Sequence, residues 1–581
     1  MSVNLKAKPY NLSDSQIQWI EETISSMTLK EKIQQLFFIL TAENNEDYLK
    51  KVTSECRFGG ARYNPGSPEQ ILSYNRTIQE NAKIPCLIAA NTESGGNGAC
   101  RGGTEVGNGT KIGSTRNPEL AYQMGYISAL EAKQVGVNTL FAPIVDIHHD
   151  FHNPVISYKC FGNNPEIVSE MSLQFLKGVQ DVGLIACAKH FPGDGYDERD
   201  QHLAPSINPL SCEEWDKSFG KVYSSLIDAG LPMIMVGHIT LPSYEKRFNP
   251  DIKEYLPATL SKEVVTDLLK GKLGFNGLVT TDATHMVALT CAMKRKDLLP
   301  RLIQAGCDMI LFYNDYDEDM SFMMEGYQQG IITDERLTDA LRRILGVKCL
   351  LGFDRKHGDE IIGNTDLSII GCEEHQKVAK EVSKEGITLV KKEDGLLPLD
   401  KEKIKKILIV PQHDENPFAF MMPKGIPTIY DYLKNRLEKE GFEVEIFKSL
   451  MQKAKESDPK QAMYLVGNVY NFKTPISSLT EKYDLIIHVM DFDSHNTVER
   501  ALWQMSKGTP DVPWYVHEVP TIMVSVRCPF HLFDAPQVKT YINTYDKNKS
   551  TLDSLVDKLV GKEEFEGVSP VDAFCNMKYG G

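Results

Sequence analysis

The chain has 581 residues, of which 25% are charged and 41% are hydrophobic, and its formal net charge is −15. This composition excludes a predominantly disordered chain and predicts either two large domains or three to five of ordinary size. The acidic balance argues against a nucleic-acid partner, because excess negative charge repels a phosphate backbone.

No run of about 18 apolar residues is present, so we expect no membrane partner. The polar start, MSVNLKAKPYNLSDSQ, lacks the apolar core of a secretory signal. Twelve cysteines are scattered without any CxxC pair, and several lie in apolar runs. We therefore expect buried reduced thiols, a cytoplasmic location and no metal.

The first part of the chain alternates helical and apolar segments. Ser13 or Asp14 is a candidate cap for a first helix, and Thr28 with Glu31 forms a capping box before a second. Eight short apolar runs follow, with amphipathic stretches such as 214–230 and 261–274 between them. This alternation predicts a parallel sheet, and eight units favour a (β/α)8 barrel over residues 1–355 rather than an open doubly wound sheet. The runs are 36–40, 58–63, 85–91, 139–145, 186–191, 232–239, 278–283 and 309–314.

Polar residues gather where these runs end. In a barrel the carboxyl ends of the strands form the active-site face, so we expect these side chains to meet in one cleft. They are Asn91 to Glu93, Asp146, Lys189, His190, His238 and Asp282.

The remainder of the chain predicts a second, smaller domain. Residues 335–351 have a helical pattern, and the polar, Gly-containing stretch 356–372 is typical of a linker. A helix over 373–386 then opens an α/β domain that extends to residue 581. Its predicted strands are 406–411, 484–490, 521–526 and 540–545.

The strongest local signal is the segment AKHFPGDGYDERDQH, residues 188–202. In an extended segment Asp200 and His202 point the same way, and a carboxylate beside an imidazole makes a proton carrier. By itself this pattern is also typical of a solvated loop. Asp282 ends a predicted strand, where a carboxylate serves as nucleophile, base, metal ligand or structural group.

Two other motifs predict no cofactor. His148 and His152 have the i, i+4 spacing of metal ligands, but no further ligand set is evident. The Gly-rich stretch NTESGGNGACRGG matches neither common nucleotide-binding pattern, so we interpret it as a tight active-site loop.

Together these stretches resemble the family-3 glycoside hydrolases. The loop KHFPGDG-x4-D-x-H is similar to that of the β-N-acetylglucosaminidase branch, and further motifs agree in order over nearly the whole chain, at 141–168, 233–244, 273–286, 379–399 and 519–545. The resemblance implies a TIM-like barrel followed by an α/β sandwich domain. It also implies that Asp282 is the catalytic nucleophile, that His202 is the acid/base with Asp200 as its partner, and that Lys189 and His190 hold sugar hydroxyls.

Four positions depart from the family pattern. Asn91 stands where the family usually has Asp, and Lys159 stands near a usual Arg, so both concern sugar binding. Asp194 occupies a position where His is frequent, and His285 replaces a small or acidic residue. Of two interpretations of His285, a packed side chain is favoured over a subsite residue.

We therefore expect a retaining exo-glycosidase that releases terminal β-linked N-acetylhexosamine, with catalytic Asp282, His202 and Asp200. The expected substrate-binding residues are Lys189, His190, Asn91, Lys159, His238 and Glu93. Its partner is a small carbohydrate, such as a muropeptide or chitin fragment; no cofactor is implied, and a homo-oligomer is compatible with the sequence. Three alternatives stay open: a β-glucosidase or other β-glycosidase, a phosphate-dependent phosphorylase, and a non-catalytic sugar-binding protein.

Overall fold

The computed structural model describes residues 2–41, 45–356, 358–413, 427–492, 500–501, 503 and 508–577. The chain divides into two compact units. The first comprises residues 1–109 and 117–379, and the second comprises 110–116 and 380–581. In this division the predicted linker, 356–372, falls within the first unit.

Eight parallel strands of the first unit close into a barrel in the order β1-β10-β9-β7-β5-β4-β3-β2. Each strand coincides with one of the eight apolar runs, with β5 beginning one residue before its run, so the predicted barrel is confirmed. The runs are continuously apolar because a barrel strand is covered on both faces. The strands are β1 (Phe37–Leu40), β2 (Gly60–Arg62), β3 (Leu87–Ala90), β4 (Thr139–Leu140), β5 (Ile185–Phe191), β7 (Met233–Val236), β9 (Leu278–Ala283) and β10 (Met309–Leu311).

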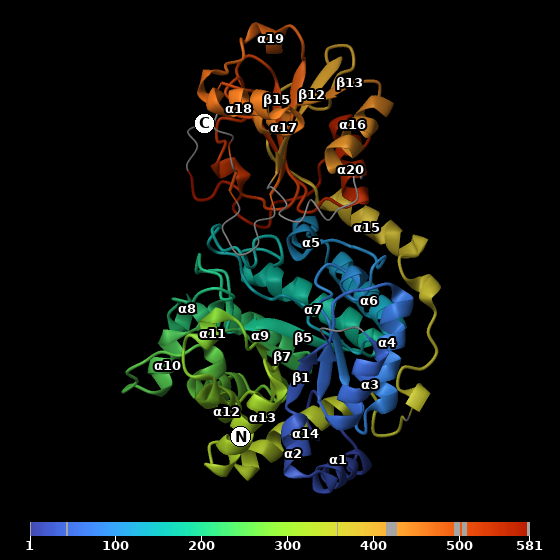
Figure 1. Cartoon of the computed structure of the whole chain (residues 1–581), viewed down its shortest axis with the longest axis vertical. Helices are drawn as coiled ribbons and strands as arrows, with labels where there is room; N and C mark the ends of the chain where they lie inside the picture. The colour runs from blue at the N-terminus through green and yellow to red at the C-terminus, as the bar shows by residue number, and fades with distance from the viewer. Residues whose placement is uncertain are drawn as a thin grey trace. The chain divides into compact units, whose positions relative to one another are not determined.

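Helices surround these strands (Figure 1). Ser13 and Thr28 each close a capping box, which begins the first two helices where the sequence predicts. The main helices of this unit are α1 (Asp14–Ser26), α2 (Leu29–Gln34), α3 (Glu46–Glu55), α4 (Pro68–Asn81), α6 (Pro118–Gln134), α7 (Pro165–Val182), α8 (Cys212–Lys217), α9 (Phe219–Asp228), α10 (Pro242–Phe248), α11 (Val287–Thr290), α12 (Arg295–Ala305), α13 (Tyr316–Gln328) and α14 (Asp334–Leu350).

Two predicted helices differ in detail. The stretch 214–230 forms α8 and α9 because Ser218 leaves the helical conformation, with φ −112° and ψ −97°. The stretch 261–274 forms a π-helix, η3 (Glu263–Lys272).

A small parallel sheet outside the barrel helps to position the site. It pairs β6 (Ser206–Ile207) with β8 (Ile239–Thr240). Because β8 follows β7 almost directly, this pairing ties the loop after β5 to the end of a second barrel strand.

The second unit contains a six-stranded sheet in the order β11-β16-β15-β14-β12-β13. Its strands are parallel except β11, which pairs antiparallel with β16. One face packs against α16 (Ile429–Lys439) and α20 (Lys549–Leu559), and buried side chains also cover the other, so the predicted sandwich is confirmed. The strands are β11 (Thr388–Lys391), β12 (Lys406–His413), β13 (Glu443–Ile446), β14 (Leu485–Asp491), β15 (Thr521–Ser525) and β16 (Thr540–Asn543). The further helices are α17 (Leu450–Glu456), α18 (Pro459–Gly467), α19 (Ser477–Thr480) and the part of α15 (Glu373–Gly386) from residue 380 on.

Among the described helices, none combines the length and apolarity needed to cross a bilayer. All twelve cysteines carry free thiols, and eight of them are buried.

Candidate active site

A cavity of about 350 Å³ opens at the carboxyl ends of the barrel strands. Seven of the nine predicted site residues line it, while Asp200 and His238 do not. The wall comprises Leu40, Arg62, Asn91, Glu93, Phe141, Ile144, Val155, Lys159, Lys189, His190, His202, Met235, Asp282, Ala283, His285, Leu311 and Phe312.

Asp282 lies near the end of β9, and 14% of its side chain is exposed. Its Oδ1 accepts a hydrogen bond from the Ala283 N–H at 2.7 Å, and its Oδ2 lies 3.8 Å from Nε2 of His190. Burial by itself raises the pKa of Asp282, but nearby His190 and other imidazoles outweigh it and hold the pKa below its usual value. The side chain is therefore an ionised carboxylate facing the cavity.

His190 is held by Asp146, which follows β4. Asp146 is fully buried and accepts hydrogen bonds from Nδ1 of His190 at 2.8 Å and from its backbone N–H at 3.1 Å. Burial lowers the pKa of His190, but the Asp146 carboxylate raises it by a larger amount, so the net pKa lies above its usual value. The imidazole therefore presents an Nε2–H donor toward the cavity beside Asp282.

Lys189 and Glu93 form an ion pair inside the cavity, from β5 and from the loop after β3. Burial raises the pKa of Glu93, but Lys189 and Lys159 lower it more strongly, to about 2. Asn91 and Lys159, the two positions that depart from the family pattern, line the same cavity. The sequence-predicted hydroxyl-binding side chains are thus brought together.

The Asp200–His202 pair forms as predicted. Oδ1 of Asp200 accepts hydrogen bonds from Nδ1 of His202 at 2.6 Å and from its backbone N–H at 2.8 Å. Half of the His202 side chain is exposed, whereas only 5% of the Asp200 side chain is. With Nδ1 bound to the carboxylate, Nε2 is left to exchange a proton with a group in the cavity.

The loop that carries this pair leaves β5 through two glycines. Gly193 and Gly195 have φ values of +123° and +120°, where a side chain is strained. A Cβ on Gly195 would also lie 2.1 Å from the Ile147 carbonyl oxygen. The PGDG turn is therefore required for the loop to turn back over the cavity.

His238 is fully buried beside the cavity. Its Nε2 donates to the Ala283 carbonyl at 3.0 Å, and its Nδ1 lies 2.9 Å from the Thr259 hydroxyl, which donates to it. Burial lowers the pKa of His238 to about 4, so the ring is neutral. Both nitrogens are engaged within the protein, so the structure places this residue behind Asp282 rather than on the substrate side.

Three functional candidates were missed or undervalued by sequence reasoning. Arg62 ends β2 and lines the cavity, a position that the end of the second apolar run signals. Asp146 follows a predicted strand, but its sequence position indicates no specific role. His285 is exposed at the cavity and stacks on Phe312 with ring centroids 6.4 Å apart, so the favoured packed interpretation is wrong.

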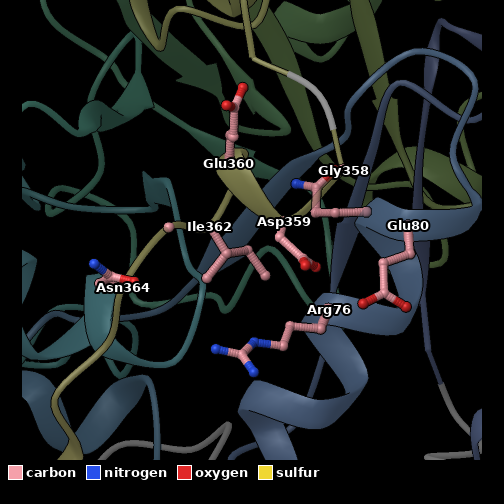
Figure 2. Close-up of a pocket in the computed structure, with 9 residues that line it drawn as sticks. Arg76, Glu80, Gly358, Asp359, Glu360, Ile362 and Asn364 are labelled. Carbon is pink, nitrogen blue, oxygen red and sulfur yellow. The ribbon is translucent and has the colours of Figure 1, made fainter.

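A second cavity, of about 550 Å³, lies between α4 and the segment 358–364. Figure 2 shows Arg76 and Glu80 on the helix side and Asp359 and Ile362 on the other. The described residues that line it include no His, Cys, Ser or Lys, so it offers no nucleophile and proton carrier together.

The histidine motif at 148–152 does not gather metal ligands. His148 is buried, and His152 pairs with Asp150 at 2.9 Å. Across the part of the chain that the structure describes, no group of three or more His, Cys, Asp or Glu side chains could hold a metal ion.

Comparison with known proteins agrees with this geometry. The model of the "Glycosyl hydrolase family 3 N terminal domain" matches residues 28–347. A beta-N-acetylglucosaminidase/beta-glucosidase of Cellulomonas fimi is 37% identical over 580 residues, which covers 99% of both chains.

Solved structures show the same similarity. A beta-glucoside phosphorylase, BglX, bound to 2FGlc has a TM-score of 0.89 and 35% identity, with 99% of both chains covered. A glycoside hydrolase family 3 beta-N-acetylglucosaminidase from Paenibacillus sp. str. FPU-7 has a TM-score of 0.75 and 25% identity, covering 95% of this chain and all of that one.

Proposed function

The chain belongs to glycosyl hydrolase family 3, and we propose that it is a retaining exo-glycosidase releasing terminal β-linked N-acetylhexosamine, chiefly N-acetylglucosamine. The observation that supports the proposal is that Asp282, the adjacent residues Lys189 and His190, and His202 all line one cavity. An ionised carboxylate, hydroxyl-binding cations and a carboxylate-oriented imidazole are the groups that such a reaction needs.

In the proposed first step, Asp282 attacks the anomeric carbon and the glycosidic C–O bond breaks. His202 donates its Nε2 proton to the departing oxygen, so the aglycone leaves as a neutral alcohol. In the second step, water attacks the same carbon while His202 accepts a proton. The ester bond to Asp282 breaks, and the sugar leaves with its original anomeric configuration.

The cavity has the features that ring positioning requires. The Lys189–Glu93 pair supplies ammonium donors and carboxylate acceptors to sugar hydroxyls, and His190 donates from Nε2. Asn91 retains one acceptor and one donor where the family usually has two carboxylate acceptors. This change weakens discrimination at the distal hydroxyls, which fits a relative named for both N-acetylglucosaminidase and glucosidase activity.

Phosphorolysis is the second candidate, and the charge of the cavity favours it. Six side chains on the wall are cationic or imidazole groups, against the two carboxylates of Glu93 and Asp282. An imidazole acid/base also does not repel an anionic acceptor as a carboxylate would. In this route phosphate replaces water in the second step and the product is a sugar 1-phosphate, as the name of the 35% identical phosphorylase implies for that protein.

The test is turnover of 4-nitrophenyl β-N-acetylglucosaminide and β-glucoside, each with and without phosphate, with the sugar product identified. Free N-acetylglucosamine, lost in Asp282→Asn, supports the first proposal. A phosphate-dependent sugar 1-phosphate replaces it with the second, and turnover of the glucoside alone moves the assignment to a β-glucosidase. Sugar binding without any turnover would leave a non-catalytic sugar-binding protein.

The acid/base role has its own test. His202→Ala should lower kcat/KM by roughly 10²- to 10⁴-fold for poor leaving groups and far less for dinitrophenyl glycosides, which need little protonation. Equal losses on both classes would contradict the role.

We also propose a reducing compartment, such as the cytoplasm, supported by the twelve free thiols; recovery of the protein in a membrane or secreted fraction would contradict it.

A further inference from the structure

The acid/base histidine stands on a loop, and a half-exposed side chain on a loop needs something to hold it. His202 lies between β5, which ends at Phe191, and β6, which begins at Ser206. Asp200 fixes the rotation of its ring, but Asp200 belongs to the same loop. The placement of the loop relative to Asp282 must therefore come from other contacts.

Gln201, which lies between Asp200 and His202 in the sequence, supplies these contacts. Its side chain is fully buried, and its amide is used at both ends. Nε2 donates to Oδ2 of Asp194 at 3.1 Å, and Oε1 accepts from the His238 backbone N–H at 2.8 Å. The loop is thus bonded to the turn after β5 and to the residues after β7.

The main chain adds a third connection, toward the nucleophile. The His202 carbonyl accepts a hydrogen bond from the Val287 N–H at 2.9 Å, and the Gln201 carbonyl accepts one from Ala288 at 3.3 Å. Val287 lies five residues beyond Asp282. The loop therefore bridges three barrel strand ends at the level of the reacting groups.

Asp194 connects Gln201 with the nucleophile side of the cavity. Its Oδ1 accepts from Nδ2 of Asn153 and from the Gly195 N–H, both at 2.7 Å, which leaves Oδ2 for Gln201. Its backbone N–H donates to Oδ1 of Asp146 at 2.8 Å, and Asp146 holds the ring of His190. One continuous hydrogen-bonded path thus runs from the neighbour of Asp282 to the acid/base loop.

We propose that Gln201 is a positioning residue, which fixes the acid/base loop against the nucleophile by bonding to Asp194 and to the His238 backbone. The inference rests on the proposed function, because it takes His202 as the proton donor. A proton donor must lie within hydrogen-bond reach of the leaving oxygen, and a misplacement of about 1 Å costs roughly 10²-fold in rate. The expected defect is therefore one of acid catalysis rather than of sugar binding.

The first experiment replaces the amide with an apolar side chain of similar length, Gln201→Met. For β-N-acetylglucosaminides with a 4-methoxyphenyl leaving group we expect kcat/KM to fall roughly 10- to 100-fold. With a 2,4-dinitrophenyl leaving group, which needs little protonation, we expect a fall below about threefold. A structural defect alone would lower both values equally.

Gln79 provides a matched control. It is also buried, and its amide also makes two hydrogen bonds, both to Cys86 at 2.9 Å, at the opposite end of β3 from the cavity. Gln79→Met should therefore cost comparable stability without changing the ratio of the two kcat/KM values. If Gln79→Met changes that ratio as much as Gln201→Met does, the inference is overturned.

The second experiment reverses the polarity of the bond. Gln201→Glu places two carboxylates against each other, and Asp194→Asn places two amide donors together, so each single variant should lose activity on the poor leaving group. The double variant restores a donor facing an acceptor, because the introduced amide still accepts from Asn153 and the introduced carboxylate still accepts from His238. Burial and Asp146 raise the pKa of Asp194 to about 7 in the parent, and two adjacent buried carboxylates share a proton, so Gln201→Glu is assayed over a range of pH values above 7.

Recovery of the leaving-group ratio in the double variant, to within about threefold of the parent, is the expected result. The inference is overturned if the losses of the two single variants simply add in the double variant. It is also overturned if both single variants keep the leaving-group ratio of the parent. The variant His202→Ala, assayed beside them, distinguishes a failure of the proposed function from a failure of the role of Gln201. If His202→Ala also leaves the leaving-group ratio unchanged, the proposed acid/base role is wrong. If only His202→Ala changes that ratio strongly, the acid/base role stands and the positioning role of Gln201 is wrong.

Discussion

Single charged residues inside the cavity couple function to stability. Glu93 pairs with Lys189 in a site where 22% and 5% of their side chains are exposed. The pKa of Glu93 is lowered from 4.5 to about 2, because the folded protein stabilises the ionised carboxylate relative to the unfolded chain. This stabilisation, about 3 kcal/mol, is present in full above about pH 4.5 and is lost as the pH falls toward about 2.

We therefore expect Glu93→Gln to lower the free energy of unfolding by up to about 3 kcal/mol at neutral pH, and by much less near pH 3. Urea unfolding at a series of pH values measures the difference. Glu166→Gln is the control, because its ion pair with Lys221 is largely exposed and contributes little. A deficit that does not shrink as the pH falls would contradict the role of the ionised Glu93.

His285 tests how far the cavity wall extends to substrate. It is exposed, lines the cavity and stacks on Phe312. Loss of a hydrogen bond or stacking contact is worth about 1–1.5 kcal/mol, so His285→Ala should lower kcat/KM roughly tenfold with little change in thermal stability. Unaltered kinetics on all substrates would mean that the ring faces solvent only.

At the scale of elements, close helix packing places glycines where no other residue fits. Helices α6 and α7 cross at Gly125 and Gly178, and a Cβ on either would lie 2.2 or 2.3 Å from a carbonyl oxygen of the other helix. Gly178→Ala should therefore cost about 1–3 kcal/mol by forcing the helices apart. Thermal unfolding checks this, with exposed Glu170→Ala on the same helix expected to stay within about 0.5 kcal/mol of the parent.

Some elements were not predictable from local pattern. The strand β13, with sequence EVEI, alternates polar and apolar residues at the edge of its sheet, unlike the continuous apolar runs of the central strands. The π-helix η3 has the same apolar periodicity as an α-helix over its short length, so the sequence does not distinguish the two. The β6–β8 pairing involves only two residues a strand and depends on contacts that the barrel creates.

At the scale of the whole molecule, the second unit contains a segment from far earlier in the chain. Residues 110–116, within α5 (Gly109–Thr115) and just after it, belong to this unit. Lys111 is fully buried there, and its Nζ lies 3.0 Å from Oδ2 of Asp546 and 3.0 Å from Oγ of Ser383. Removing one partner of such a pair leaves an unpaired buried charge.

Lys111→Met should consequently destabilise the protein by about 3–5 kcal/mol, and adding Asp546→Asn should recover part of that loss. Urea unfolding of the single and double variants measures the coupling. Lys377→Met, which breaks an exposed pair with Glu373, is expected to change stability by less than about 1 kcal/mol. Purely additive losses in the double variant would show that Lys111 and Asp546 do not act as a pair.

The barrel is predictable from the apolar pattern alone, because each strand is buried on both faces and must be a continuous apolar run. The pattern also located most of the polar side chains of the cavity wall, since Asn91, Lys189 and Asp282 lie close to strand ends, and the D-x-H spacing sufficed for the Asp200–His202 pair. Contacts between distant segments become apparent only in the folded chain. The roles of Asp146, His238 and Gln201 arise from hydrogen bonds to residues 21 to 48 positions away or to another strand end, and no local pattern encodes such partners.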